Sequence, residues 1–307
     1  MKRRSFLKKS VAAGLATSAA FYVGKQGIAQ GAVPPQAGDP FDLIAIKGGE
    51  PDTMFDKAID IYGGMKRFVK KGQTVVVKPN IGWDAPPERA ANTNPILVKR
   101  VVEHCFNAGA KQVYVFDHTC NNWVKSYKNS GIQDAAKDAG AKVVPGNSES
   151  YYQEVNIDSE GIITESKIHE LILESDVFIN IPVLKNHNSS KVTIAMKNLM
   201  GIIWDRGYWH RNGLHQAIAE FPLWRTPDLN IVDAYRVMKR NGPRGVSNAD
   251  SVKMQYQLLS TDIVAVDAAA TKVFGLDPAN VPYIQKAHEF GIGNKNLDEL
   301  NIKRIAV

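Results

Sequence analysis

The sequence has few cysteines, and this scarcity excludes two classes of protein. Cys105 and Cys120 are its two cysteines, whereas an iron–sulfur cluster needs about four thiolates. Cys105 is expected in a helix and Cys120 beyond the far end of the following strand. At ~3.3 Å per strand residue, their separation exceeds the reach of a disulfide. The sequence therefore predicts two unpaired thiols and no resident iron–sulfur cluster.

Short catalytic and metal-binding motifs are also missing. The chain contains no His-Glu-x-x-His, no Cys-x-x-Cys and no glycine-rich phosphate loop of either standard type. No serine-centred elbow indicates a hydrolase. A bound metal would therefore need histidines from separate loops. The candidates are His118, His187, His210 and His215.

The N-terminus carries an export pattern. Arg3-Arg4-Ser5-Phe6-Leu7-Lys8 precedes an apolar run at 11–23, and Gly27-Ile28-Ala29 offers a small-residue cleavage site. The run is too short to span a bilayer. We predict that residues 1–29 are a twin-arginine (Tat) signal peptide, that the Tat machinery is a partner, and that the protein is periplasmic or extracellular. An ordinary amphipathic N-terminus is the alternative. Export in the folded state also favours a bound cofactor.

Most of the positive charge lies in this predicted signal. The formal net charge is +7, and removing the signal with its six basic residues leaves about +1. A nearly neutral mature chain argues against nucleic acid as a partner. No other apolar stretch approaches ~20 residues, so the mature chain is not expected to span a membrane. Residues 30–40 are rich in Pro, Gly and Ala and are expected to form a flexible lead-in.

Residues 41–307 are expected to form one α/β domain, with a division into two lobes left open. β-Branched runs predict strands at 43–46, 74–78, 112–116, 141–144, 177–181, 229–232, 255–259 and 302–307. Helical periodicity predicts helices at 52–70 (with a break at Gly63-Gly64), 95–108, 132–139, 192–200, 214–220, 263–274 and 281–290. Apolar strands separated by amphipathic helices indicate a mostly parallel, doubly wound sheet with helices on both faces.

Polar side chains follow four of these strands. Lys78–Gly82, Asp117–Thr119, Lys185–His187 and Asp233 each occupy a strand end. One polar strand end is usually solvated surface, but four in the same topological position favour a binding site. We predict that one cavity is lined by Lys78, Asn80, His118, Lys185, His187 and Lys197.

The segment 185–201 is the richest in candidate groups. A helix beginning near Ser190 would present an N-terminus that favours an anion. Lys197 and Asn198 would follow two turns later, with Met196 and Leu199 beside them. Lys197 is then either a snorkelling surface lysine or an inward amine that pairs with a charge or forms a covalent bond. A buried amine needs a partner. The carboxylates expected to supply one are Asp233, Asp262 and Asp267.

These segments resemble the family called "domain of unknown function 362", from about residue 40 to the end. The resemblance rests on K-P-N-I-G at 78–82, I-N-I-P-V-L-K-N-H at 179–187, T-I-A-M-K-N-L-M-G at 193–201, N-I-V-D-A at 230–234 and S-T-D-I-V-A-V-D-A at 260–268. Many relatives carry a ferredoxin-type cysteine cluster, which this chain lacks. The resemblance therefore implies a fold and a family but no reaction.

A more distant resemblance is to the nickel-pincer lactate racemases. In that family a basic residue, a histidine, and a later His followed by Lys occur in the same order and hold a nickel-bearing nicotinic-acid derivative. The resemblance implies these roles for Lys78, His118, His187 and Lys197, with His215 as a further metal ligand. The glycine-rich stretch expected before the lysine is replaced by Thr193-Ile194-Ala195-Met196, and Lys78 stands where an arginine is expected.

The sequence favours an exported enzyme that binds a small anionic substrate or cofactor at the carboxyl edge of the sheet, with acid–base, isomerase or redox chemistry. The expected catalytic groups are His118, His187 and Lys197. The expected cofactor- or anion-binding groups are Lys78, Asn80, Lys185, Lys197, Asn198 and Asp233. A histidine with a pKa near ~6.5 suits proton exchange at neutral pH. There are two alternatives. The protein could bind an anion in the periplasm without turnover, or it could be a scaffold or maturation partner of a secreted redox complex.

Replacing Arg3 and Arg4 together with lysine is expected to leave the protein in the cytoplasm. The twin-arginine carrier recognises the guanidinium pair, which lysine does not reproduce. Cell fractionation with immunoblotting measures the effect, and Lys8→Arg is a control that leaves the pair intact. Unchanged export would show that the general secretory route handles this signal.

Overall fold

The computed structural model describes residues 41–157 and 159–307. The predicted signal and lead-in lie outside this range. The strands are β1 (Leu43–Lys47), β2 (Thr74–Pro79), β3 (Gln112–Val115), β4 (Lys142–Val143), β5 (Tyr152–Asn156), β6 (Glu165–His169), β7 (Val177–Ile181), β8 (Val183–His187), β9 (Lys191–Thr193), β10 (Leu229–Met238), β11 (Ser251–Ser260) and β12 (Ile302–Ala306). The helices are α2 (Pro51–Ile61), α3 (Pro95–Ala108), α4 (Trp123–Asn129), α5 (Ile132–Asp138), α6 (Glu170–Glu174), α7 (Ala195–Asn198), α8 (Arg206–Asn212), α9 (Leu214–Glu220), α10 (Ile263–Phe274) and α11 (Pro282–Glu289).

Within the described residues, the central sheet has ten strands, with the order β12-β1-β11-β10-β7-β2-β3-β4. β8 pairs with β10, and β9 pairs with β8. The pairs from β10 through β7, β2 and β3 to β4 are all parallel, whereas β11 runs antiparallel to both of its neighbours. β5 and β6 form a separate hairpin. The predicted mostly parallel α/β sheet is confirmed.

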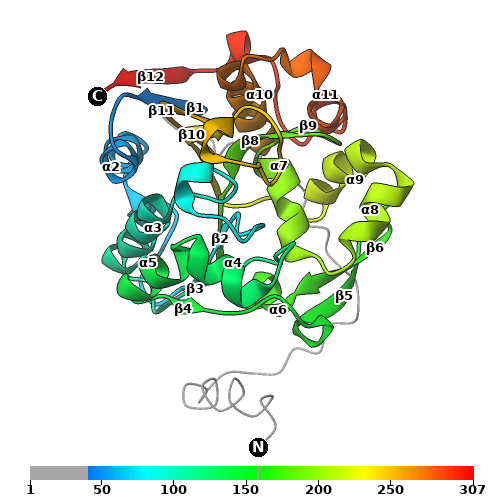
Figure 1. The fold of residues 1–307 in the computed structure, drawn as a ribbon, viewed down its shortest axis with the longest axis horizontal. Helices are drawn as coiled ribbons and strands as arrows, with labels where there is room; N and C mark the ends of the chain where they lie inside the picture. Colours follow the sequence, from blue (N-terminus) through cyan, green and yellow to red (C-terminus); the bar gives the residue numbers. More distant parts are fainter. Residues whose placement is uncertain (1–40, 158) are drawn as a thin grey trace, which may run out of the picture.

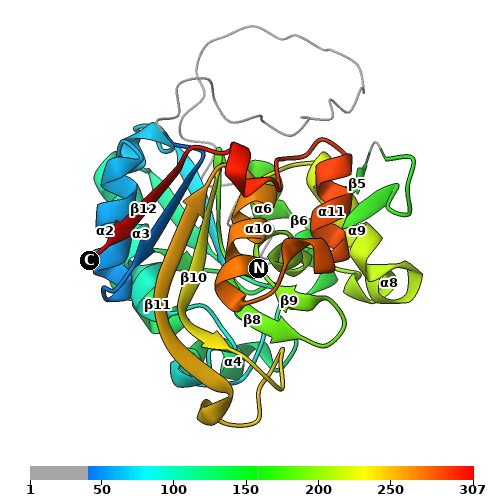
Figure 2. The same cartoon turned by 90° about the horizontal axis from the view of Figure 1, so that it is seen from above.

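Helices cover both faces of the sheet, as predicted. α2, α3 and α5 lie on one face, and α7, α9, α10 and α11 lie on the other (Figures 1 and 2). Alternate residues of β2 divide between these layers: Val75 and Val77 join the first core, and Val76 joins the second. This is the period of two that a strand imposes on its side chains. Every helix in the described residues is too short or too polar to reach across a bilayer.

Local signals set the bounds of several helices. α3 has the predicted bounds because Asn94 accepts a hydrogen bond from the Ile96 N–H, Pro95 occupies the first turn, and Gly109 ends the helix with a φ of 106°. These are the preferred residues at those positions. α9 and α10 also have the predicted bounds.

The predicted helix at 192–200 starts too early, and only its later part, from Ala195, is helical. β8 and β9 form an antiparallel hairpin that pairs Lys185 with Thr193, and α7 begins only at Ala195. A 3₁₀ helix, Leu199–Ile202, follows α7. The run Val192-Thr193-Ile194 favours extended chain, and β8 supplies the partner strand. The anion site expected at a helix N-terminus near Ser190 is therefore corrected: this turn belongs to a hairpin.

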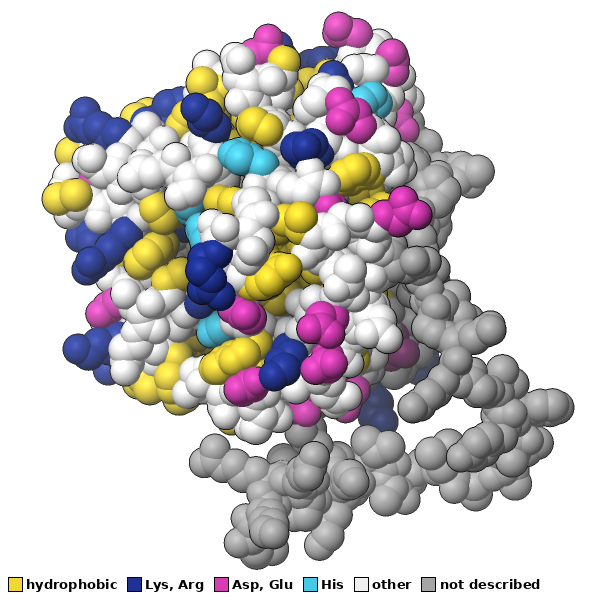
Figure 3. Space-filling model, turned by 90° about the vertical axis from the view of Figure 1, so that its right-hand side faces the viewer, with side chains coloured by type: hydrophobic (Ala, Val, Ile, Leu, Met, Phe, Trp, Pro, Cys, Tyr) yellow, Lys and Arg dark blue, Asp and Glu magenta, His cyan; other side chains and the backbone are white. Residues whose placement is uncertain are grey.

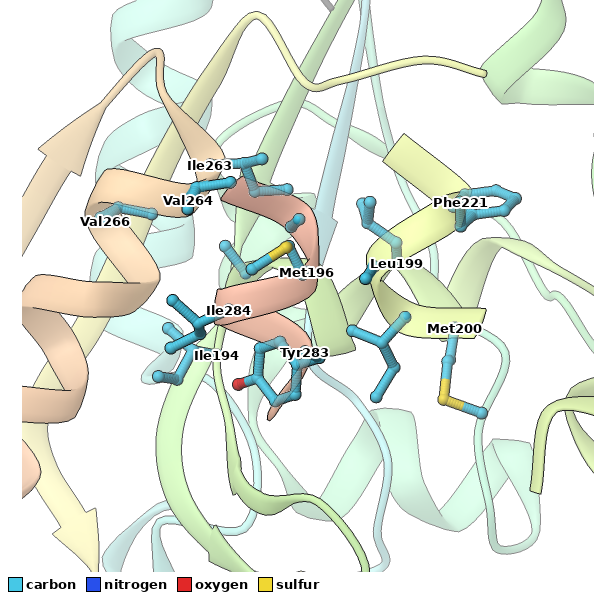
Figure 4. Packing of buried hydrophobic residues seen from close by; sticks show 14 of the residues in the cluster. Ile194, Met196, Leu199, Met200, Phe221, Ile263, Val264, Val266, Tyr283 and Ile284 are labelled. Carbon is cyan, nitrogen blue, oxygen red and sulfur yellow. The ribbon is translucent and has the colours of Figure 1, made fainter. Parts of the chain in front are cut away.

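Asp267 of α10 holds the start of α7. Its carboxylate accepts hydrogen bonds from the backbone N–H groups of Ala195 at 2.7 Å and Met196 at 3.2 Å. These donors have no partner inside the helix, so the carboxylate satisfies them. Met196 and Leu199 belong to the same buried cluster as residues of α10 and α11 (Figure 4). The carboxylate and the apolar contacts together fix the position of α7.

Replacing Asp267 with alanine is expected to lower the free energy of unfolding by about 1–3 kcal/mol, because buried N–H groups lose their acceptor. Asp267→Asn keeps one acceptor oxygen and a similar volume. Burial raises the pKa of Asp267 well above its ordinary value, so the neutral amide should cost less. Chemical denaturation measures both variants. Equal losses would contradict this account.

Candidate functional site

A cavity of about 630 Å³ lies where the parallel strands end. Its wall contains all six residues that the sequence predicted there, which are Lys78, Asn80, His118, Lys185, His187 and Lys197. Asn198 also lines the wall. α8 adds Arg206 and His210. Histidine and basic side chains lie beside one another on the face that carries α8 and α9 (Figure 3). The predicted common location is confirmed; the catalytic and binding roles stay predictions.

Lys78 lies at the floor of the cavity in a buried ion pair. Its Nζ is 2.9 Å from Asp117 Oδ1 and donates a hydrogen bond to Asn198 Oδ1 at 2.8 Å. Burial lowers the pKa of Lys78, and the Asp117 charge opposes this shift. Asp117 also accepts a hydrogen bond from the Ile81 N–H at 2.6 Å. This pair joins the ends of β2 and β3.

Gly201 allows the chain to pass directly over this ion pair. A Cβ at Gly201 would lie 1.8 Å from Asp117 Oδ1 and 2.5 Å from Lys78 Nζ. The Gly201 carbonyl also accepts a hydrogen bond from the His118 N–H at 3.0 Å. Any side chain at this position would displace the pair, so glycine is required by the close approach rather than by a turn.

A row of asparagines connects β7, β10 and the residue after β2 with α7. Asn198 Nδ2 donates to Asn180 Oδ1 at 2.8 Å, and Asn180 Nδ2 donates to Asn230 Oδ1 at 3.0 Å. Asn80 Nδ2 donates to Asn198 Oδ1 at 2.8 Å. Buried amides that satisfy one another in this way fix each side chain in one orientation. The network holds the cavity floor rigid.

Lys185 and Lys197 have no carboxylate partner among the described residues. Lys185 Nζ donates to Asn80 Oδ1 at 3.0 Å and to the Ala91 carbonyl. Lys197 Nζ contacts Met200 Sδ at 3.1 Å, and the residue is only 9% exposed. Burial lowers the pKa of Lys185 to about 7 and that of Lys197 to about 8. Lys197 is therefore an inward amine and not a snorkelling surface lysine.

The three carboxylates expected beside Lys197 make other contacts, so that prediction is wrong. Asp267 caps α7, and Asp262 accepts hydrogen bonds from the Val264 and Ala265 N–H groups at the start of α10. Asp233 accepts from the Asn94 and Tyr235 N–H groups. Asp233 is buried outside the cavity wall, and burial raises its pKa to about 6. Its expected role in binding a cofactor is corrected to a structural one.

His187 is neutral in this setting. Burial, followed by the charges of Lys197 and Lys185, lowers its pKa to about 3. Its Nδ1 accepts hydrogen bonds from the Ser189 N–H at 3.1 Å and the Ser190 N–H at 3.4 Å. A proton on the ring must therefore be on Nε2. This histidine can donate a hydrogen bond near neutral pH, but it does not take up a second proton there.

His118 lies flat against an aromatic wall. Its ring stacks on Trp204 with the centroids 5.0 Å apart and the planes 3° from parallel. Its Nδ1 is 2.9 Å from the Ile203 carbonyl, so Nδ1 carries the hydrogen. Burial, followed by the Arg206 charge, lowers the pKa of His118. Its Nε2 is the nitrogen left to act as a base.

The predicted histidine metal site is corrected. His215 is absent from the cavity wall and stacks on Tyr283 of α11 at 5.9 Å. Within 41–157 and 159–307, no three His, Cys, Asp or Glu side chains gather in an arrangement that could hold a metal ion. His118, His187 and His210 lie in the cavity wall without forming such a group, and many of the other polar lining side chains are ammonium or amide groups, which are poor metal ligands. The histidine set that the racemase resemblance implies is therefore incomplete in this cavity, because His215 lies outside the wall.

Among the wall residues that the sequence prediction missed are Cys120, Thr193 and Arg206. Asp117 was recognised in the polar strand end beside His118, but it was given no role in the site. Arg206 reaches the site from a distance, because its Nη1 donates to the His118 carbonyl 88 residues away at 2.7 Å. No local pattern marks such a contact.

Fold and site together define an α/β protein with a cationic cavity at the carboxyl edge of its sheet. Residues 75–272 match the family described as "Domain of unknown function (DUF362)". This match covers more than half of the chain, so the protein belongs to that family, and the resemblance found in the sequence is confirmed.

Two similar proteins show how far the likeness extends. The "Thylakoid-associated protein sll1697" of Synechocystis sp. is 26% identical over 242 residues, which cover 76% of this chain and 73% of that protein. The lactate racemase apoprotein from Thermoanaerobacterium thermosaccharolyticum has a TM-score of 0.49 and 12% identity, covering 75% of this chain and 56% of that one. The present chain thus spans little more than half of the racemase.

The ligand-free protein is expected to gain stability from Lys185 as the pH rises from about 7 to 10. The pKa of Lys185 is about 7 in the folded protein and ~10.4 in an unfolded chain. Between these values the unfolded chain binds a proton that the folded protein does not, so rising pH favours folding. Chemical denaturation at several pH values, compared with Lys185→Met, isolates this contribution. The prediction would be contradicted if the difference in free energy of unfolding between the wild type and Lys185→Met stayed constant or fell from pH 7 to 10.

Proposed function

We propose that this protein binds a small anionic molecule in the cavity, with Lys185 and Lys197 as the principal charged contacts. The observation that carries the proposal is the pair of buried ammonium groups without a carboxylate partner among the described residues. Arg206 adds a third cation at the wall. Asp117 is engaged with Lys78. The cavity thus has more positive than negative charge.

Buried ammonium groups cost free energy when the cavity holds no anion. Removing an ammonium from water costs several kcal/mol unless a partner compensates. Like charges add to that cost, and each of Lys197 and Lys78 lowers the pKa of Lys185. An anion between these groups removes both penalties and draws the lysines to their protonated forms. The arrangement is explained by a ligand more simply than by packing.

The same lysines support acid–base chemistry on the bound anion. With a pKa of about 8, Lys197 holds or releases a proton close to neutral pH, which is the range that general acid–base catalysis needs. His118 Nε2 is the second group for proton transfer. His187 orients the ligand by donating a hydrogen bond from Nε2. Lys197 takes the role of titrating base that the sequence had suggested for His187. The proposed activity is a proton-transfer reaction of isomerase type.

We propose that the protein acts outside the cytoplasm after export through the twin-arginine pathway. The arginine pair, the apolar run and the small-residue cleavage site support this location. A cofactor or ligand acquired before export would explain the use of a carrier for folded proteins.

Replacing Lys197 with methionine is expected to weaken the binding of inorganic phosphate by about tenfold or more, since a charge-assisted hydrogen bond is worth ~1.5–3 kcal/mol. Methionine keeps most of the volume, so the fold should persist. Isothermal titration calorimetry measures affinity, and Lys125→Met, an exposed lysine of α4, is the matched control. Equal affinity in Lys197→Met and wild type would refute the proposal. Tight binding without turnover of any bound anion would identify a binding protein instead of an enzyme.

A further inference from the structure

Cys120 is a thiol in the wall of the cationic cavity. It lies in the loop after β3 and is exposed, whereas Cys105 is fully buried in α3. Arg206 Nη1 contacts Cys120 Sγ at 3.4 Å. The same guanidinium donates to the His118 and Thr119 carbonyls at 2.7 and 2.9 Å. The loop is therefore held with its sulfur beside a fixed positive charge.

Lys185 and Lys197 line the same cavity wall as this sulfur. A negative charge on Cys120 raises the pKa of both Lys185 and Lys197, against the effect of burial. The ammonium groups that would hold an anion therefore also attract a thiolate. An anion bound by them would be brought near the Cys120 sulfur.

Thr193 points independently to a ligand in this cavity. It is 3% exposed, lines the wall, and its Oγ1 has no hydrogen-bond partner within the described residues. It is paired with Lys185 in the β8–β9 ladder, so both side chains leave the same face of the hairpin. A buried hydroxyl without a partner costs free energy. A ligand oxygen held by Lys185 would satisfy it.

We propose that Cys120 is a nucleophile for small carboxylates or phosphates that carry an aldehyde group. This inference rests on the proposed anion binding and names the substrate class of that same site. The sulfur forms a bond to the carbonyl carbon, the C=O π electrons move to oxygen, and that oxygen takes the proton lost by the thiol. The product is a thiohemiacetal. No electron is gained or lost, no group leaves, and no co-reactant is needed.

Alkylation rates provide the first test. An ordinary thiolate reacts more slowly with anionic iodoacetate than with neutral iodoacetamide, because like charges repel. The cavity should reverse this order at Cys120 and favour iodoacetate by about tenfold. Intact mass and peptide mapping follow the reaction, with Cys120→Ser as the blank. Arg206→Gln should lower the ratio of the iodoacetate rate to the iodoacetamide rate, because it removes one of the cations that attract the anionic reagent. A faster reaction with iodoacetamide in the wild type would overturn the proposal.

Protection provides the second test and separates this inference from anion binding alone. Glyoxylate, which has an aldehyde, should protect Cys120 from iodoacetamide at concentrations where acetate does not. Equal protection by the two, with phosphate still binding by calorimetry, would overturn the nucleophile and leave the anion site standing. Absence of phosphate binding would overturn both.

Discussion

The site depends on one buried ion pair between Lys78 and Asp117. It ties the end of β2 to the end of β3 and receives Asn198 from the segment that follows β9. An ammonium this deeply buried is tolerated because a carboxylate lies 2.9 Å away and the Asn198 amide oxygen accepts a hydrogen bond from it. Gly201 closes over the pair, since no larger residue fits there. The pair adds a side-chain link to the β2–β3 backbone ladder at the point where the two strands end at the cavity.

The other two buried lysines are in a different position. The structure compensates Lys78 internally but leaves Lys185 and Lys197 with neutral partners. Proteins commonly place such locally unfavourable groups where a ligand will meet them. The asparagine row makes hydrogen bonds within itself and with Lys78. Under the proposed function, an anionic ligand would supply the charge partner that Lys185 and Lys197 lack.

The histidines show how burial changes the chemistry expected from a residue type. In the sequence, His118, His187 and His215 suggested metal ligands or titrating bases. Backbone contacts fix the tautomers of His118 and His187, and burial among lysines keeps His187 neutral. His215 contacts Tyr283 instead of the cavity. His187 therefore does not titrate near neutral pH, whereas the pKa values of Lys185 and Lys197 are about 7 and about 8.

The sequence by itself determined the elements whose signals are local. α3 has its cap, its first-turn proline and its terminal glycine within 16 residues, and the strand ends that supply Lys78 and His118 follow from β-branched runs. Tertiary structure decided the β8–β9 hairpin, the start of α7 and the partners of Lys197. The start of α7 depends on Asp267, whose carboxylate accepts a hydrogen bond from the Ala195 N–H 72 residues earlier in the chain. In the same way, Arg206 donates a hydrogen bond back to the loop after β3. Periodicity reports which faces of a segment are apolar, but it carries no information about which distant charge will meet a given side chain. That is decided only when the chain closes on itself.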